Sequence, residues 1–79
     1  MRLDKYLKVS RIIKRRTIAS EACSAGKVMV NDKVAKPSVI VKPGDIITVT
    51  FGTNITKVQI ISLKDSVKKE EAVLMYRSL

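Results

Sequence analysis

The sequence predicts an α+β domain, in which two short N-terminal helices pack on a small, mostly antiparallel sheet and a C-terminal helix follows. Three observations indicate this fold class. Apolar residues recur at helical spacing before Gly26, they alternate with polar residues after it, and turns containing Gly or Pro separate the later segments. A chain of 79 residues has room for one small domain.

The segment before Gly26 predicts two short helices and not one long helix. One apolar stripe covers residues 3–7, and a second begins at Ile18. Cations recur at every third position over residues 2–14. In a straight helix they would shift by about 60° at each step and leave no apolar face. We therefore expect a bend near Ser10 and a helix end at Gly26, which favours left-handed backbone.

The middle of the chain predicts strands. Residues 27–31 alternate as a half-buried strand does, and strand-rich segments follow at 46–51 and 55–63. Asn31-Asp32-Lys33 and Lys42-Pro43-Gly44-Asp45 predict turns, the second of type II because Pro precedes Gly. With the segment between these two turns counted as a further strand, the predicted order is two helices, four strands and one helix.

The last segment, residues 65–76, predicts the C-terminal helix. Asp65 or Ser66 is expected to cap it, and good helix formers follow. We expect residues 1–63 to form the body of the domain and residues 64–79 to be a helical tail within that same single domain.

Positive charge dominates the chain. The formal net charge is +9, from 16 Lys and Arg against 7 Asp and Glu. Within residues 2–16 the only acid is Asp4, and the arginine guanidinium groups suit two-point contacts with phosphate. A polyanionic partner, RNA or DNA, is therefore indicated. The series of cations consists of Arg2, Lys5, Lys8, Arg11, Lys14, Arg15 and Arg16.

Asp4 has two interpretations at this point. It can stabilise the first helical turn and pair with Lys8, four residues later. It can also orient Arg2, or accept a hydrogen bond from a ribose hydroxyl.

Catalysis and metal binding find little support. The chain has no His and one Cys, so it lacks an imidazole base and a zinc ligand set, and no phosphate-binding glycine pattern occurs. We expect no enzyme activity, no cofactor and no metal, with Cys23 in the core. The apolar stretches fall far short of the ~20 residues that span a bilayer, and no secretory signal is visible, so we expect a cytoplasmic protein without a membrane contact.

Several separated blocks resemble the RNA-binding domain named after small-subunit ribosomal protein S-four, also called the αL motif. The resemblance covers about residues 1–50. The tail is similar to that of the ribosome-associated quality control protein P (RqcP) group; the related heat-shock-protein-fifteen group usually carries a longer basic extension. The matching blocks are Arg2-Leu3-Asp4, Arg11, Arg15 to Ala19, Gly26 to Asn31, Lys36 to Ser38 and Val41 to Ile47.

The resemblance implies RNA binding on the large ribosomal subunit. Such a protein would contact large-subunit rRNA and peptidyl-tRNA on a subunit obstructed after stalling, and would support an RqcH-type tailing factor that adds alanine to the nascent chain. We expect a ribosome-associated monomer. The family usually has Asn-Gly where this chain has Asn31-Asp32. The implied RNA-binding residues are Arg2, Asp4, Lys5, Arg11, Lys14, Arg15 and Arg16.

The sequence also allows other functions. One is a large-subunit recycling factor of the heat-shock type. Another is a helix-turn-helix DNA-binding regulator, although the short neutral side chains of residues 19–25 offer little to read bases with. A membrane-surface peptide would need Trp or Phe opposite its cations, and an accessory domain of a pseudouridine synthase would need a catalytic domain.

Overall fold

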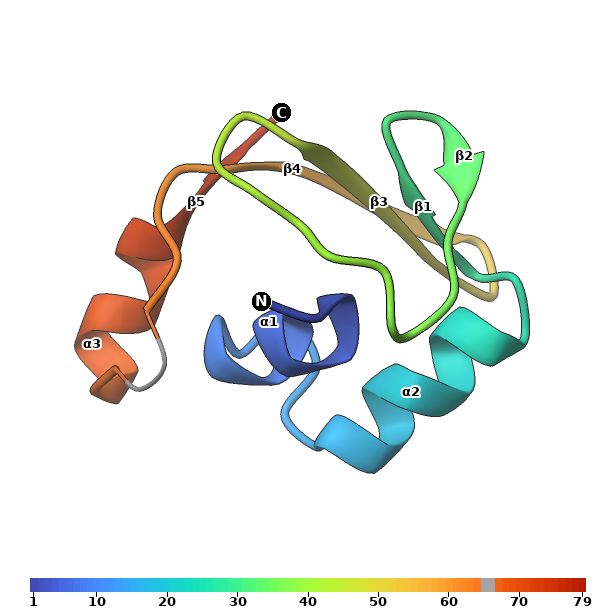
Figure 1. The fold of residues 1–79 in the computed structure, drawn as a ribbon, viewed down its shortest axis with the longest axis horizontal. Helices are drawn as coiled ribbons and strands as arrows, with labels where there is room; N and C mark the ends of the chain where they lie inside the picture. Colours follow the sequence, from blue (N-terminus) through green and yellow to red (C-terminus); the bar gives the residue numbers. More distant parts are fainter. Residues whose placement is uncertain (65–66) are drawn as a thin grey trace.

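The computed structural model describes residues 1–64 and 67–79, and it shows a five-stranded sheet with two helices beneath one face (Figure 1). All strand pairs are antiparallel, in the order β2-β1-β3-β4-β5. The predicted α+β class is therefore confirmed. The elements are α1 (Leu3–Val9), α2 (Arg16–Ser24), β1 (Val28–Val30), β2 (Lys33–Val34), β3 (Ile46–Phe51), β4 (Asn54–Ile60), α3 (Lys69–Ala72), the 3₁₀ turn η1 (Val73–Met75) and β5 (Tyr76–Ser78).

The core lies between the sheet and the two helices. Side chains that share one face of the sheet stand opposite each other in the register, as Ile47 does with Val58, and both are buried. Leu3, Tyr6 and Leu7 of α1 are fully buried with them. The apolar stripe read from the sequence is thus the face that α1 turns toward the sheet, and the cations are left at the surface.

The predicted bend between the helices is confirmed. α1 ends at Val9, and Ser10 forms its C-cap. Arg11 then takes a left-handed conformation with φ of 62°, its N–H donating to the Lys8 carbonyl at 3.0 Å. The chain turns there and leads into α2.

Gly26 ends the second helix as predicted. Its φ is +76°, its N–H donates to Cys23, and the next N–H, of Lys27, donates to Ala22. This is the Schellman motif, which satisfies carbonyl groups that the helix end leaves without partners.

Both predicted turns are present. Asn31 and Asp32 have φ values of 52° and 67°, the paired left-handed residues of a type I′ hairpin, and they join β1 to β2. Gly44 has φ of +96°, and the Asp45 N–H donates to the Lys42 carbonyl, as a type II turn requires. Asp32 therefore adopts a left-handed conformation, which glycine would take without a side-chain cost.

The C-terminal prediction is only partly right. The helix covers Lys69–Ala72, one 3₁₀ turn follows, and Tyr76–Ser78 pair with β4 as a fifth strand that the sequence pattern did not indicate. β4 also ends at Ile60, three residues before the predicted end at Leu63. The predicted cap at Asp65 or Ser66 lies outside the described residues. In the described part of the chain, no helix has the length and apolar character to cross a membrane.

Candidate nucleic-acid interface

The start of α1 is held in place by a loop that comes later in the chain. The first two N–H groups of the helix, those of Leu3 and Asp4, donate to the carbonyls of Val39 and Pro37 at 2.8 and 3.2 Å. These helix N–H groups have no partner within the helix, so the loop replaces a capping side chain. This arrangement fixes the position of Asp4 in the first turn.

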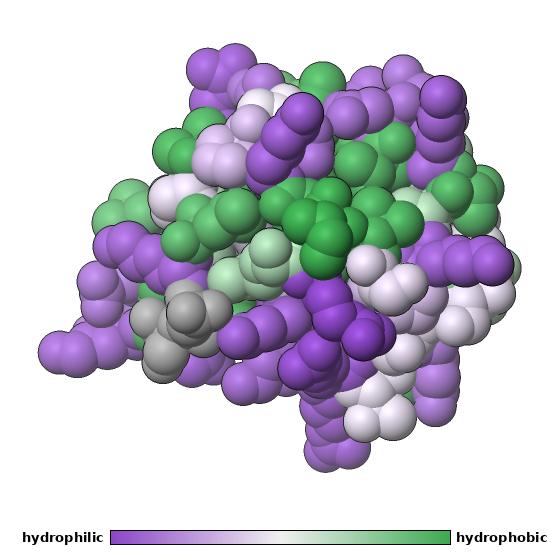
Figure 2. Space-filling model, viewed as in Figure 1, coloured by the Kyte–Doolittle hydropathy of each residue, from purple (hydrophilic) through white to green (hydrophobic). Residues whose placement is uncertain are grey.

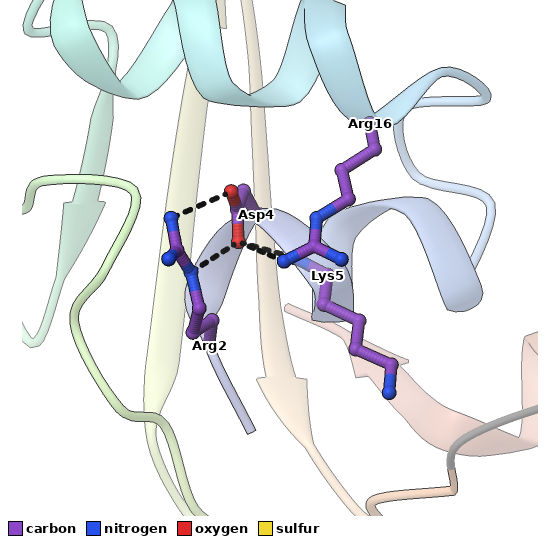
Figure 3. Close-up of polar contacts among 4 residues, drawn as sticks. All are labelled: Arg2, Asp4, Lys5 and Arg16. Atoms are coloured by element: carbon purple, nitrogen blue, oxygen red, sulfur yellow. Dashed lines mark hydrogen bonds and ion pairs between the residues drawn. The ribbon is translucent and has the colours of Figure 1, made fainter.

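Asp4 of α1 binds two arginines, as Figure 3 shows, and the second of them connects α1 to α2. Arg2, just before α1, donates from Nε to Oδ1 at 3.2 Å and from Nη2 to Oδ2 at 3.1 Å. Arg16, the first residue of α2, donates from Nη2 to Oδ1 at 3.4 Å. The Lys5 N–H also donates to Oδ1, at 2.8 Å. We call Arg2, Asp4 and Arg16 the arginine clamp.

The Asp4 carboxylate is stabilised in its charged form. The residue is only 3% exposed, and this burial by itself would raise its pKa. Hydrogen bonds from Arg2 and the Lys5 backbone, together with the charges of Arg16 and Arg2, outweigh burial and lower the pKa below its ordinary value. The clamp therefore keeps its charge throughout the neutral range.

The two arginines retain donors that face solvent. Each guanidinium has about five N–H donors; Arg2 uses two of them on Asp4 and Arg16 uses one. Both side chains are 48% exposed. One buried carboxylate thus holds two guanidinium groups in defined positions, one from the residue before α1 and one from α2, each with free N–H groups for phosphate oxygens.

The structure decides between the two interpretations of Asp4 in part. Among the described residues, its side-chain partners are Arg2 and Arg16, and Lys8 is not one of them. Asp4 therefore orients arginines, including one twelve residues away that spacing along a single helix does not indicate.

The other predicted site residues do not all lie beside the clamp. Lys5 is half-buried beside the clamp (Figure 3), and Arg15 is exposed as the N-cap residue of α2. Arg11 and Lys14 instead line a pocket against the C-terminal segment. The cations thus belong to more than one neighbourhood and do not form one row.

Three residues near these cations were not predicted as site residues. Lys69 and Tyr76 line the pocket together with Arg11 and Lys14. Ile40, which is 68% exposed, forms an isolated β-bridge with Arg2. The face of the molecule drawn in Figure 2 has an apolar band across its centre, with hydrophilic residues gathered below it over α1 and the start of α2. The contacts that bring these residues together depend on the folded chain.

In the described part of the chain, no three Asp, Glu or Cys side chains come together as metal ligands. Burial, followed by the negative charge of Asp4, raises the pKa of the Cys23 thiol to about 11. Cys23 therefore remains a neutral core residue, as the sequence predicted.

Comparison with known proteins shows which family this chain resembles. The S4 domain model matches residues 1–47. The RQC P-site tRNA stabilizing factor of Bacillus subtilis is 56% identical over 79 residues, covering all of this chain and 92% of that protein. The protein of the same name from Halalkalibacterium halodurans is 51% identical over 76 residues, covering 96% of this chain and 86% of the relative.

The fold is also similar to a solved structure. The trimeric structure of heat shock protein 15 from Vibrio cholerae superposes with a TM-score of 0.93 at 35% identity, over all of this chain and 81% of that one. The matched S4 region contains both helices, the hairpin and the type II turn, so it includes the whole arginine clamp.

Proposed function

We propose a function for this chain on the basis of its family, because it belongs to the S4 domain family. Its relatives named RQC P-site tRNA stabilizing factor are aligned over nearly its whole length. On this basis the chain is an RNA-binding protein of ribosome-associated quality control, with a binding role and no catalytic one. Cytoplasmic location on the ribosome follows from the same assignment.

The specific proposal is that the chain binds large-subunit rRNA and peptidyl-tRNA on large ribosomal subunits that are obstructed after stalling. There it would support a tailing factor of the RqcH type, which adds alanine to the nascent chain. We expect it to act as a monomer, since a net charge of +9 opposes self-association. The similar heat shock protein 15 is described as a trimer, so sedimentation of the free protein tests this point.

The arginine clamp is the observation that supports RNA binding. Folded RNA presents phosphates in an irregular arrangement, and proteins recognise such RNA by shape and phosphate position. Two guanidinium groups held by one carboxylate match two phosphates at a defined separation. Arg11, Lys14 and Arg15 extend the cationic surface beyond the clamp, and Lys5 lies beside it.

The test is co-sedimentation with large subunits that carry peptidyl-tRNA. Arg16→Ala should lose about one to two powers of ten in affinity, because a charge-assisted contact is worth about 1.5–3 kcal/mol, and Arg2→Ala with Arg16→Ala should lose more. Lys57→Ala, which removes an exposed cation from β4 away from the clamp, is the matched control. The salt dependence of wild-type binding should have a logarithmic slope of about −3 to −5 if roughly four to six phosphates are neutralised.

Equal sedimentation of the double variant and the Lys57→Ala control would show that the clamp is a solvated surface and would contradict the proposal. A recycling factor of the heat-shock type is the second candidate, favoured by the Vibrio cholerae similarity. It is distinguished by adding an RqcH-type factor: alanine tailing that is independent of the chain would favour recycling.

A further inference from the structure

A second cationic site lies between the connection of α1 to α2 and the C-terminal segment. It is a pocket of about 340 Å³. Its wall from the first segment carries Arg11 and Lys14, beside the buried Ser10, and its wall from the second segment carries Lys69, Val73 and Tyr76. The two walls are more than fifty residues apart in sequence, so only folding creates the site.

The backbone at Arg11 is held in an unfavourable conformation that places this residue at the pocket. Its φ is 62°, and an L-residue in the left-handed region costs about 1–2 kcal/mol unless local hydrogen bonds assist it. Hydrogen bonds from the N–H groups of Arg11 to Lys8 and of Ile13 to Leu7, both 3.0 Å, maintain the turn. A left-handed residue commonly follows a helix end, and here it places Arg11 at the pocket.

On the wall from the C-terminal segment, the cation and the apolar side chains lie on one side of the helix. Lys69, Ala72 and Val73 have the i, i+3, i+4 spacing of one helical face. Glu70 and Glu71 lie about 100° and 200° around the helix axis from Lys69. The described residues that line the pocket therefore include three cations and no acid.

The pocket wall is also anchored to the core. Tyr76 begins β5 and pairs with Ile60 of β4. The residue before it, Met75, is buried, and its carbonyl accepts a hydrogen bond from the Tyr6 hydroxyl at 2.8 Å. The half-buried Tyr76 ring is thus held at a defined position and does not sit on a free tail.

We propose that this pocket holds one unpaired nucleotide of the bound RNA, with its phosphate near Arg11, Lys14 and Lys69 and its base against the Tyr76 ring and Val73. The volume is at the lower end of the range for small-ligand sites, about 300–1,000 Å³, which suits a single nucleotide and excludes a duplex. Aromatic rings stack on exposed bases, and cations beside them take the phosphate. The inference rests on the proposed RNA-binding function and adds an unpaired nucleotide as its ligand.

The charge of the pocket favours a nucleotide as its occupant. Within residues 1–64 and 67–79, none of the three pocket cations is in an ion pair, whereas the clamp arginines are paired with Asp4. A site with three unneutralised cations and one aromatic ring is complementary to a nucleotide, which carries one phosphate and one flat base. Val73, 59% exposed, supplies apolar area beside the ring.

The experiment compares two RNA probes with the full chain. One is a hairpin with a single-stranded loop, and the other is a blunt duplex with the stem of that hairpin. Tyr76→Leu removes the ring and should lower affinity for the hairpin by about fivefold to a hundredfold, with little effect on the duplex. Tyr76→Phe keeps the ring and should bind as wild type does. Lys69→Gln should weaken hairpin binding and reduce its salt slope by nearly one phosphate contact.

Matched controls separate this inference from the proposed function. Lys57→Gln should leave hairpin binding close to wild type, and melting curves show whether Tyr76→Leu is folded. Lys69 is exposed, so Lys69→Gln gives an answer even where Tyr76→Leu is not folded.

If Arg2→Ala with Arg16→Ala loses large-subunit binding while Tyr76→Leu and Lys69→Gln bind the hairpin as wild type does, the nucleotide pocket is refuted and the proposed function stands. If Lys69→Gln impairs only alanine tailing and no RNA binding, the pocket takes a protein partner and the inference is equally refuted.

Discussion

The hydroxyl of Tyr6 donates a hydrogen bond of 2.8 Å to the backbone carbonyl of Met75, 69 positions along the chain. Both residues are buried. Burial raises the pKa of the Tyr6 phenol strongly, with a further contribution from nearby Tyr76, so the hydroxyl remains a donor. The bond connects α1, which carries Asp4 of the clamp, to the segment that forms the pocket wall.

Tyr6→Phe should lower the free energy of unfolding by about 0.5–1.5 kcal/mol. The loss is moderate because the Met75 carbonyl also accepts from the N–H groups of Ile61 and Ser62, at 2.8 and 3.2 Å, and is not left without a partner. Urea denaturation measures the change. Tyr76→Phe is the matched control, since it removes a hydroxyl from a half-buried tyrosine; an equal loss in both variants would contradict the role of the Tyr6 bond.

Asp4→Asn should weaken binding to large subunits although it raises the net charge from +9 to +10. Asn still accepts from the Lys5 N–H but no longer holds Arg2 and Arg16 by charge. Each arginine that must then be ordered on binding costs about 0.5–1.5 kcal/mol. Affinity is measured by co-sedimentation at fixed salt. Tighter binding would mean that charge alone determines affinity and that clamp geometry does not contribute.

The stability that Asp4 contributes should depend on pH in the acid range. Its folded pKa is lowered, so the contribution is fully present above the unfolded carboxyl pKa of about 3.9 and is lost as pH falls through the lower folded value. The difference in unfolding free energy between wild type and Asp4→Asn should therefore shrink below about pH 4. Urea titrations at several pH values measure it, and a constant difference would rule out the ionised Asp4 as its source.

Asp32→Gly should stabilise the hairpin by about 0.5–1 kcal/mol, because Gly adopts φ of 67° without the side-chain cost. Asn31→Gly should have the opposite effect. The Asn31 side chain donates to Asp45 at 3.1 Å and accepts from the Ile46 N–H at 2.9 Å, and losing these bonds costs about 1–2 kcal/mol. Thermal melting compares the two. A destabilised Asp32→Gly would show that Asp32 has a favourable contact beyond its backbone conformation.

Cys23 should react slowly with thiol reagents in the folded protein. With a pKa of about 11, roughly a thousandth of the thiol is ionised at pH 8, against about a quarter for an exposed cysteine of pKa ~8.5. Alkylation should therefore be at least about a hundredfold slower than in urea-unfolded protein. Rapid labelling of the native chain would indicate that α2 opens readily.

The elements that the sequence predicted well are those with local backbone signals. Gly26, Asn31-Asp32 and Pro43-Gly44 each mark a change of direction, and the structure has a left-handed residue at each of the three places. Such signals work because dihedral preferences belong to single residues and their immediate neighbours. The apolar stripe of α1 was equally readable, since its helical period is a local property.

The C-terminal strand shows where local signals stop. Residues 69–76 contain good helix formers, yet the α-helix covers only Lys69–Ala72 and a 3₁₀ turn follows it. A helix this short has little stability of its own. The open edge of β4 offers Tyr76–Ser78 backbone partners instead. Residues 58–60 form that edge, and nothing in the sequence of the last segment indicates that it will pair with them.

The sequence by itself therefore determined the fold class, the helix bend, the turns and the excess of positive charge, because composition and local dihedral preference carry them. Only the tertiary structure decided which charges act together. Asp4 pairs with Arg16 across the bend and not with Lys8 on its own helix, and Arg11 and Lys14 meet Lys69 and Tyr76. These neighbours depend on how the helices and the last strand pack on one sheet, and packing joins residues by distance in space and not by spacing along the chain.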